Sequence, residues 1–121
     1  MRHAKNLAFG ARLRFALDGL RHALRSERSF RTQVAVLVLV ALALAILRPE
    51  PLWWALVALA SSGVLGAELL NTAIEQLADH LHPDVHASIR VVKDCAAAGV
   101  LVTALGAVGV GVALLVHLVT K

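Results

Sequence analysis

The sequence contains few charged and few aromatic residues for a chain of 121. Charged residues make up 17% and aromatic residues 4%, with no tyrosine, whereas hydrophobic residues reach 59%. A soluble domain is about half apolar and about a quarter charged. A chain long enough for one compact unit cannot hold so large an apolar excess in its own core, so we expect lipid to solvate it.

Other absences narrow the classes of protein further. The single cysteine, Cys95, excludes a disulfide within the chain. The sequence contains neither GxxxxGK[ST] nor GxGxxG, so any nucleotide is bound without those phosphate loops. The first 31 residues carry charges throughout and lack a continuous apolar stretch, so we expect no cleaved signal peptide.

Basic residues gather at the start of the chain, where eight of the twelve Lys and Arg fall in the first 31 residues and only Asp18 and Glu27 oppose them. Leucines recur there at intervals of four, three and four: Leu13, Leu17, Leu20 and Leu24. We therefore predict an amphipathic surface helix over 1–28, with its arginines toward anionic headgroups. The alternatives are a solvated helix packed on the same protein and a segment that binds nucleic acid.

Three apolar stretches follow, and we predict membrane-spanning helices over 29–47, 52–79 and 88–119. The segment 48–51 holds two prolines and two charges, which is typical of a tight turn. Trp53 and Trp54 open the second span, as in an interfacial aromatic belt. The positive-inside rule places the N-terminus and the 79–94 loop in the cytoplasm.

Four polar residues lie on one face of the second span, within an arc of about 80° at 3.6 residues per turn. They are Glu68, Asn71, Glu75 and Asp79. Ionisable groups at this depth are costly and usually mark function. The carboxylates suit a hard cation such as Mg²⁺, a general base, or a proton or cation pathway. Glu27 offers a further oxygen ligand at similar depth, or a surface partner for Arg28 or Arg31.

Two further groups lie at the same cytoplasmic boundary. A lysine and an aspartate, Lys93 and Asp94, open the third span, where the lysine suits a polyphosphate. Three histidines, His80, His82 and His86, share the preceding loop. Their loose spacing favours solvated loop residues over a transition-metal site.

Three segments together resemble the bacterial diacylglycerol kinase family, which includes undecaprenol kinases. They are Glu68-Leu69-Leu70-Asn71-Thr72-Ala73-Ile74-Glu75 followed by Asp79, Arg25-Ser26-Glu27-Arg28-Ser29-Phe30-Arg31, and Val92-Lys93-Asp94-Cys95-Ala96-Ala97-Ala98-Gly99. These segments occur in the family's order, and the resemblance extends over nearly the whole chain. It implies a protein of the bacterial inner membrane. The resemblance implies an all-α homotrimer of three-span subunits with shared active sites, transferring the ATP γ-phosphate to a lipid hydroxyl.

The resemblance also implies roles for individual residues. Glu68 is the expected general base, supported by Asn71 and Asp79. Glu27 and Glu75 are the expected Mg²⁺ ligands. The expected ATP-binding residues are Lys93, Asp94, Glu27, Glu75, Asp84, His86 and Phe15, and the expected lipid or surface contacts are Arg12, Arg14 and Arg31.

Some positions differ from the best-known Gram-negative members. Gln33 stands where they often carry Glu, Ala97 replaces a serine, and Ala8 falls near a basic position that Arg12 or Arg14 can supply. The catalytic set is intact, but the acceptor stays open between diacylglycerol, our first choice, and undecaprenol.

Two other classes of protein remain as alternatives. A small cation or proton transporter would use the acidic face, yet it needs polar residues through the full depth of a span, and 53–67 offers only Ser61 and Ser62. A structural membrane adaptor gives no reason for the acidic face.

Overall fold

The computed structural model describes residues 6–121, which form four helices and no strand. Their bounds are α1 Phe9–Ser26, α2 Arg28–Leu47, α3 Pro51–Leu81 and α4 Ala87–Val119. The prediction of an all-helical chain is confirmed, and α2, α3 and α4 are each long and apolar enough to cross a membrane. Residues 1–5 of the predicted surface helix lie outside the described residues.

A short turn separates α2 from α3. α2 ends at Leu47 and is capped by Arg48, which adopts the left-handed conformation at φ 48° and ψ 55°. The Arg48 N–H donates to the Leu44 carbonyl at 2.9 Å. Pro51 opens α3, where its fixed φ suits a helix and its missing N–H leaves no bond unmade. The two residues together reverse the chain within a few positions.

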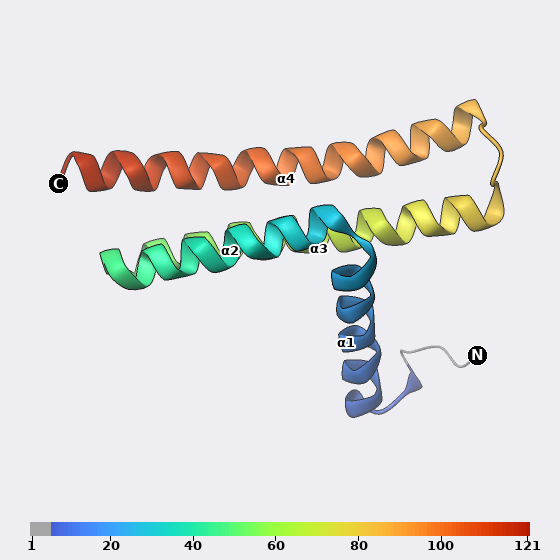
Figure 1. The fold of residues 1–121 in the computed structure, drawn as a ribbon, viewed down its shortest axis with the longest axis horizontal. Coiled ribbons are helices and arrows are strands. Elements are labelled where there is room, and N and C mark those ends of the chain that lie inside the picture. The colour runs from blue at the N-terminus through green and yellow to red at the C-terminus, as the bar shows by residue number, and fades with distance from the viewer. Residues whose placement is uncertain (1–5) are drawn as a thin grey trace.

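α2, α3 and α4 run along the long axis of the molecule, and α1 runs across them (Figure 1). α4 packs beside α3 over much of its length, whereas α2 approaches α3 over a shorter stretch. The α2–α3 turn and the C-terminus lie at one end, which we call the apolar end. The α3–α4 loop lies at the other, and we call the part of the molecule from the start of α2 to this loop the polar end.

The helices differ in length in a way that bears on the site. At 1.5 Å per residue, the 20 residues of α2 extend about 30 Å, the thickness of a hydrocarbon core, while the 31 of α3 extend about 46 Å. Ser29 at the start of α2 contacts Glu68 on α3. The 13 residues of α3 that follow Glu68 therefore project beyond the start of α2 by about 20 Å, and we call this part the overhang.

The largest buried cluster lies at the apolar end and joins all three long helices. Leu44 of α2, Val57 of α3 and Leu114 of α4 form it, with Trp53 packed against it. The Trp53 ring also lies against the His117 ring, with centroids 5.3 Å apart. Elsewhere little is buried, with only 6% of the most apolar stretch of α4 covered, so lipid or other protein must cover the remainder.

Candidate active site

Glu68 is the most buried of the predicted site residues, with only 5% of its surface exposed. The Ser29 hydroxyl donates a hydrogen bond to its Oε2 atom at 3.1 Å. Ser29 is the second residue of α2, so the carboxylate lies beside a helix N-terminus, whose unpaired N–H groups favour negative charge. Among residues 6–121, this hydroxyl is the one side-chain donor to Glu68. The other oxygen, Oε1, accepts no hydrogen bond there and is available to accept a proton from a substrate.

Asn71 and Glu75 continue the face along the overhang, and both are half-buried. The Asn71 Oδ1 atom is buried without a hydrogen-bond partner in the described part of the chain. Glu75 lies two turns beyond Glu68, about 10 Å farther along the axis. No Lys, Arg or His of residues 6–121 lies within ion-pair distance of it. The face thus offers one buried carboxylate at the level where α2 begins and one accessible carboxylate beyond it.

The overhang ends in an ion pair that joins α3 to α4, in which Lys93 contacts Asp79. Its side chains are 36% and 63% exposed, so solvent screens the attraction and the pair adds little stability. Asp94 turns instead toward Arg90 on its own helix, at 3.9 Å. The structure therefore pairs Lys93 with the acidic face and not with its neighbour in the sequence.

Glu27 forms the elbow between α1 and α2, with an extended backbone at φ −108° and ψ 109°. Its N–H donates to the Ala23 carbonyl at 2.9 Å, and its side chain is half-buried. The Arg31 guanidinium donates to the carbonyls of Leu24 and Arg25 at 3.1 and 2.9 Å. A cation at these carbonyls is favourable because they end α1. Arg31, predicted at the lipid surface, thus holds the elbow in this structure.

α1 presents small residues to α3. Ala16, Gly19 and Ala23 face Thr72 and Ala73 across a groove of about 450 Å³. Ala23 and Thr72 are 2% and 8% exposed, and the His22 ring shares a hydrogen bond with the Gln76 amide at 2.8 Å. The leucines of α1 remain between 38% and 49% exposed. Leu20 also lines this groove, and all four leucines have surface left for lipid or another protein to cover.

The remaining predicted residues lie apart from Glu68 and are exposed. Phe15 is 52% exposed on α1, and Arg12 and Arg14 are exposed beside it. Asp84 is exposed in the α3–α4 loop. His86 caps α4, where its Nδ1 accepts from the Ser88 N–H at 3.2 Å, and its ring lies 5.3 Å from that of His82.

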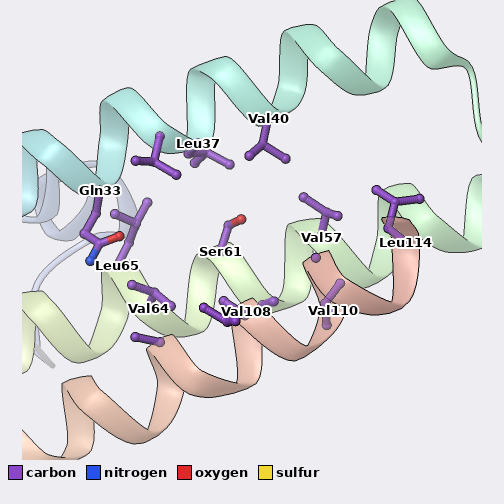
Figure 2. Close-up of a pocket in the computed structure, with 15 residues that line it drawn as sticks. Gln33, Leu37, Val40, Val57, Ser61, Val64, Leu65, Val108, Val110 and Leu114 are labelled. Carbon is purple, nitrogen blue, oxygen red and sulfur yellow. The ribbon is translucent and has the colours of Figure 1, made fainter. Parts of the chain in front are cut away.

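A groove of about 400 Å³ opens between α2, α3 and α4 (Figure 2). Leu37 and Val40 lie on its α2 side and Val57 and Val64 on its α3 side, so its walls are mainly apolar. The Ser61 hydroxyl points into this space, and Gln33 lies at one end of it. Gln33, which differs from the best-known family members, is therefore a groove residue in this fold.

The described chain alone does not form a complete metal centre. In residues 6–121, no three His, Cys, Asp or Glu side chains converge as a metal site would require. Mg²⁺ in phosphoryl-transfer sites is commonly held by one or two carboxylates together with the substrate phosphates and waters. A pair such as Glu27 and Glu75 meets that weaker requirement in the chemistry of its donors.

Sequence reasoning missed two hydrogen-bonding groups of this site. Ser29 lies within the 25–31 motif, yet nothing in the spacing of that motif connects it to Glu68, 39 residues away. The His22–Gln76 contact joins residues 54 apart. The sequence offered one hint of these contacts, namely that Ser29, His22 and Gln76 are polar residues in a largely apolar chain.

Comparison with known proteins agrees with these features. The family model described as "Prokaryotic diacylglycerol kinase" matches residues 14–115. A protein of Synechocystis sp. named "Diacylglycerol kinase" is 39% identical over 103 residues, which cover 84% of this chain and 59% of that relative. The chain thus spans somewhat more than half of that relative's length. Together with the three apolar helices, these similarities identify the chain as a multi-pass membrane protein that belongs to the prokaryotic diacylglycerol kinase family.

Proposed function

We propose that this chain is an ATP-dependent kinase that converts diacylglycerol to phosphatidic acid. The observation that carries the proposal is the buried Glu68 carboxylate at the level where α2 begins, with the accessible Glu75 carboxylate farther along the overhang and Lys93 of α4 beside it. A base at that level can meet a lipid hydroxyl at the membrane surface, while the overhang reaches water and a soluble nucleotide. The family match and the name of the Synechocystis relative support this function.

In the proposed reaction, the lipid enters sideways from the bilayer and ATP from the aqueous side. Glu68 Oε1 accepts the proton of the lipid hydroxyl as its oxygen bonds to the γ-phosphorus. The bond from that phosphorus to the β–γ bridging oxygen breaks, and ADP leaves. Phosphoryl transfer of this kind depends mainly on positioning and charge neutralisation.

Glu27 and Glu75 are the residues that we propose to hold Mg²⁺. Both are half-buried carboxylates, and neither has a cationic partner within residues 6–121. When bound, the ion would neutralise phosphate charge. Asn71 and Asp79 would support these ligands from the same face of α3.

We assign the nucleotide to the overhang and the adjoining loop. Lys93 would exchange Asp79 for a phosphate, at small cost because the ion pair is solvent-exposed. The other proposed contacts are Asp94, Asp84, His86 and Phe15. The apolar groove between α2, α3 and α4 offers room for an acyl chain.

We propose that the protein lies in the bacterial inner membrane with its N-terminus in the cytoplasm. α1 runs across the long helices, as an interfacial helix would, with Arg12 and Arg14 free to contact anionic headgroups (Figure 1). We also propose a homotrimer with shared active sites, which would cover part of the exposed apolar surface. Light scattering of the purified protein in micelles tests that state, and a monomeric mass would contradict it.

The proposed function is tested with the purified chain in detergent micelles and ATP labelled in the γ-phosphate. We expect labelled phosphatidic acid from diacylglycerol, dependent on Mg²⁺. A parallel assay with undecaprenol separates the two acceptors, and faster labelling of undecaprenol would reassign the substrate. Absence of labelling in every lipid alcohol would overturn the kinase proposal.

A further inference from the structure

Glu68 receives its hydrogen bond from a side chain that sequence reasoning did not assign to the site. The Ser29 hydroxyl lies 3.1 Å from Glu68 Oε2, and the bond connects the first turn of α2 to the middle of α3. Glu68 is 5% exposed whereas Ser29 is exposed, so the bond lies at the edge of the buried region. A buried carboxylate that loses its donor loses both an interaction and a fixed orientation.

The backbone that carries Ser29 is held by the two residues that follow it. Phe30, the next residue, is 2% exposed and anchors the first turn of α2 in the protein. Arg31 binds the last carbonyls of α1 through two hydrogen bonds. Ser29 therefore presents its hydroxyl from a fixed point, whereas the glutamate side chain has three rotatable bonds of its own.

We propose that Ser29 is a positioning residue for Glu68, an inference that rests on the kinase function proposed above. The bond to Oε2 restrains the carboxylate so that Oε1 faces the lipid hydroxyl. Restraint of this kind raises the rate of the chemical step because the reacting atoms are already oriented. The restraint leaves nucleotide binding unchanged, because the Ser29 hydroxyl lies beside Glu68 and the proposed nucleotide contacts lie farther along α3, on the overhang.

The experiment compares three variants of the full chain in the micelle assay. We expect Ser29→Ala to lower kcat about tenfold, with KM for MgATP within about twofold of wild type. Ser29→Thr keeps a hydroxyl at the same position, and we expect it to retain at least about half of the wild-type kcat. Ser26→Ala removes a hydroxyl three residues away whose one hydrogen bond within residues 6–121 is to the His22 carbonyl of its own helix, so we expect wild-type kinetics.

A double-variant cycle shows whether Ser29 acts through Glu68. We expect Ser29→Ala to cause no further loss when added to Glu68→Gln, because the oriented base is already absent. A further loss of the same size would show that Ser29 acts elsewhere and would overturn the inference. So would a Ser29→Ala enzyme with wild-type kcat, or a Ser29→Thr enzyme as slow as Ser29→Ala.

Thermal unfolding distinguishes a positioning role of Ser29 from a structural one. The unfolding temperature of Ser29→Ala should stay within about 3 °C of wild type, and a larger fall paired with an equal loss in Ser29→Thr would indicate a structural role. If the wild-type chain labels diacylglycerol and Ser29→Ala matches it, only the Ser29 inference fails. If the wild-type chain labels no lipid alcohol, both the kinase proposal and the Ser29 inference fail.

Discussion

The two ends of the molecule are held together by different interactions. At the apolar end, Leu44, Val57 and Leu114 pack into a buried cluster with Trp53 against it. At the polar end, the contacts between elements are directional: Ser29 with Glu68, Arg31 with the end of α1, and Lys93 with Asp79. The apolar end is held mainly by packing, whereas the polar end combines buried residues such as Ala23 and Phe30 with polar side chains that can take part in chemistry.

The difference follows from the solvent. Lipid is as apolar as leucine, so helices in a bilayer gain little from the hydrophobic effect and associate through close packing and hydrogen bonds. The overhang projects beyond α2, where water can hydrate its acidic groups and lowers the free energy needed to keep them charged. We therefore expect substitutions at the polar end to change activity more than stability, and those at the apolar end to do the reverse.

The largest effect is expected at Glu68. Glu68→Gln keeps the volume and a hydrogen bond from Ser29 but removes the proton acceptor, so kcat should fall by about 10²–10⁴-fold. Initial rates of labelled phosphatidic acid formation measure this loss. The unfolding temperature in the same micelles should be nearly unchanged. Loss of the folded state in Glu68→Gln would mean that the residue is structural.

The next effect is expected at Glu75. Glu75→Gln removes one carboxylate from the proposed Mg²⁺ ligands and should weaken the apparent affinity for Mg²⁺ by at least about tenfold. Titrating Mg²⁺ at fixed ATP measures the change. Glu50→Gln, which alters an exposed carboxylate at the apolar end, is the matched control. Wild-type Mg²⁺ dependence in Glu75→Gln would contradict the assignment of Glu75 as a Mg²⁺ ligand.

Leu44→Ala tests the apolar end. Leu44 is 2% exposed, and its truncation should cost about 2 kcal/mol of unfolding free energy. That is the low end of the range for soluble cores, because the lost contribution is packing alone. Leu39→Ala is the control, since Leu39 is 66% exposed on the same helix. Denaturant or thermal unfolding in micelles compares them, and equal costs would contradict a packed cluster.

A smaller effect is expected at the elbow. Arg31→Gln removes the guanidinium that binds the Leu24 and Arg25 carbonyls and should destabilise the end of α1 by about 1 kcal/mol. Hydrogen exchange of the Glu27 amide, which is bonded to Ala23, reports the loss. Arg28→Gln makes the same change of charge about one turn away. Equal exchange in both variants would show that the cap has no effect.

The smallest effect is expected at the Lys93–Asp79 pair. Asp79→Asn should change the unfolding free energy by less than about 1 kcal/mol, because both side chains are partly exposed and solvent screens the pair. Unfolding at low and high salt provides the measurement. A loss of several kcal/mol would mean that the pair is a structural joint between α3 and α4.

Much of the architecture follows from local sequence. Pro51 and the charges around it set the start of α3, and the long apolar stretches indicate the three long helices. The acidic face is also local, because Glu68 and Glu75 recur at the helical period. These features depend on residues close together in the chain, so periodicity and turn chemistry reveal them.

The contacts between helices could not be predicted in the same way. The Ser29–Glu68 bond joins residues 39 apart, and Lys93 selects Asp79 on α3 over its neighbour Asp94. Both contacts depend on the axial offset of α2 and of α4 relative to α3, which no local pattern in the sequence specifies. Arg31 is similar, since a basic residue at the start of a span indicates a headgroup contact until the direction of α1 is known.

The most direct measurement is kcat for phosphate transfer to diacylglycerol in Glu68→Gln and Leu44→Ala side by side, at a temperature where both remain folded. If the chemistry lies at the polar end, Glu68→Gln loses at least about 100-fold and Leu44→Ala stays within about twofold of wild type. Equal rates in the two variants, or a larger loss in Leu44→Ala, would contradict the assignment of Glu68 as the base.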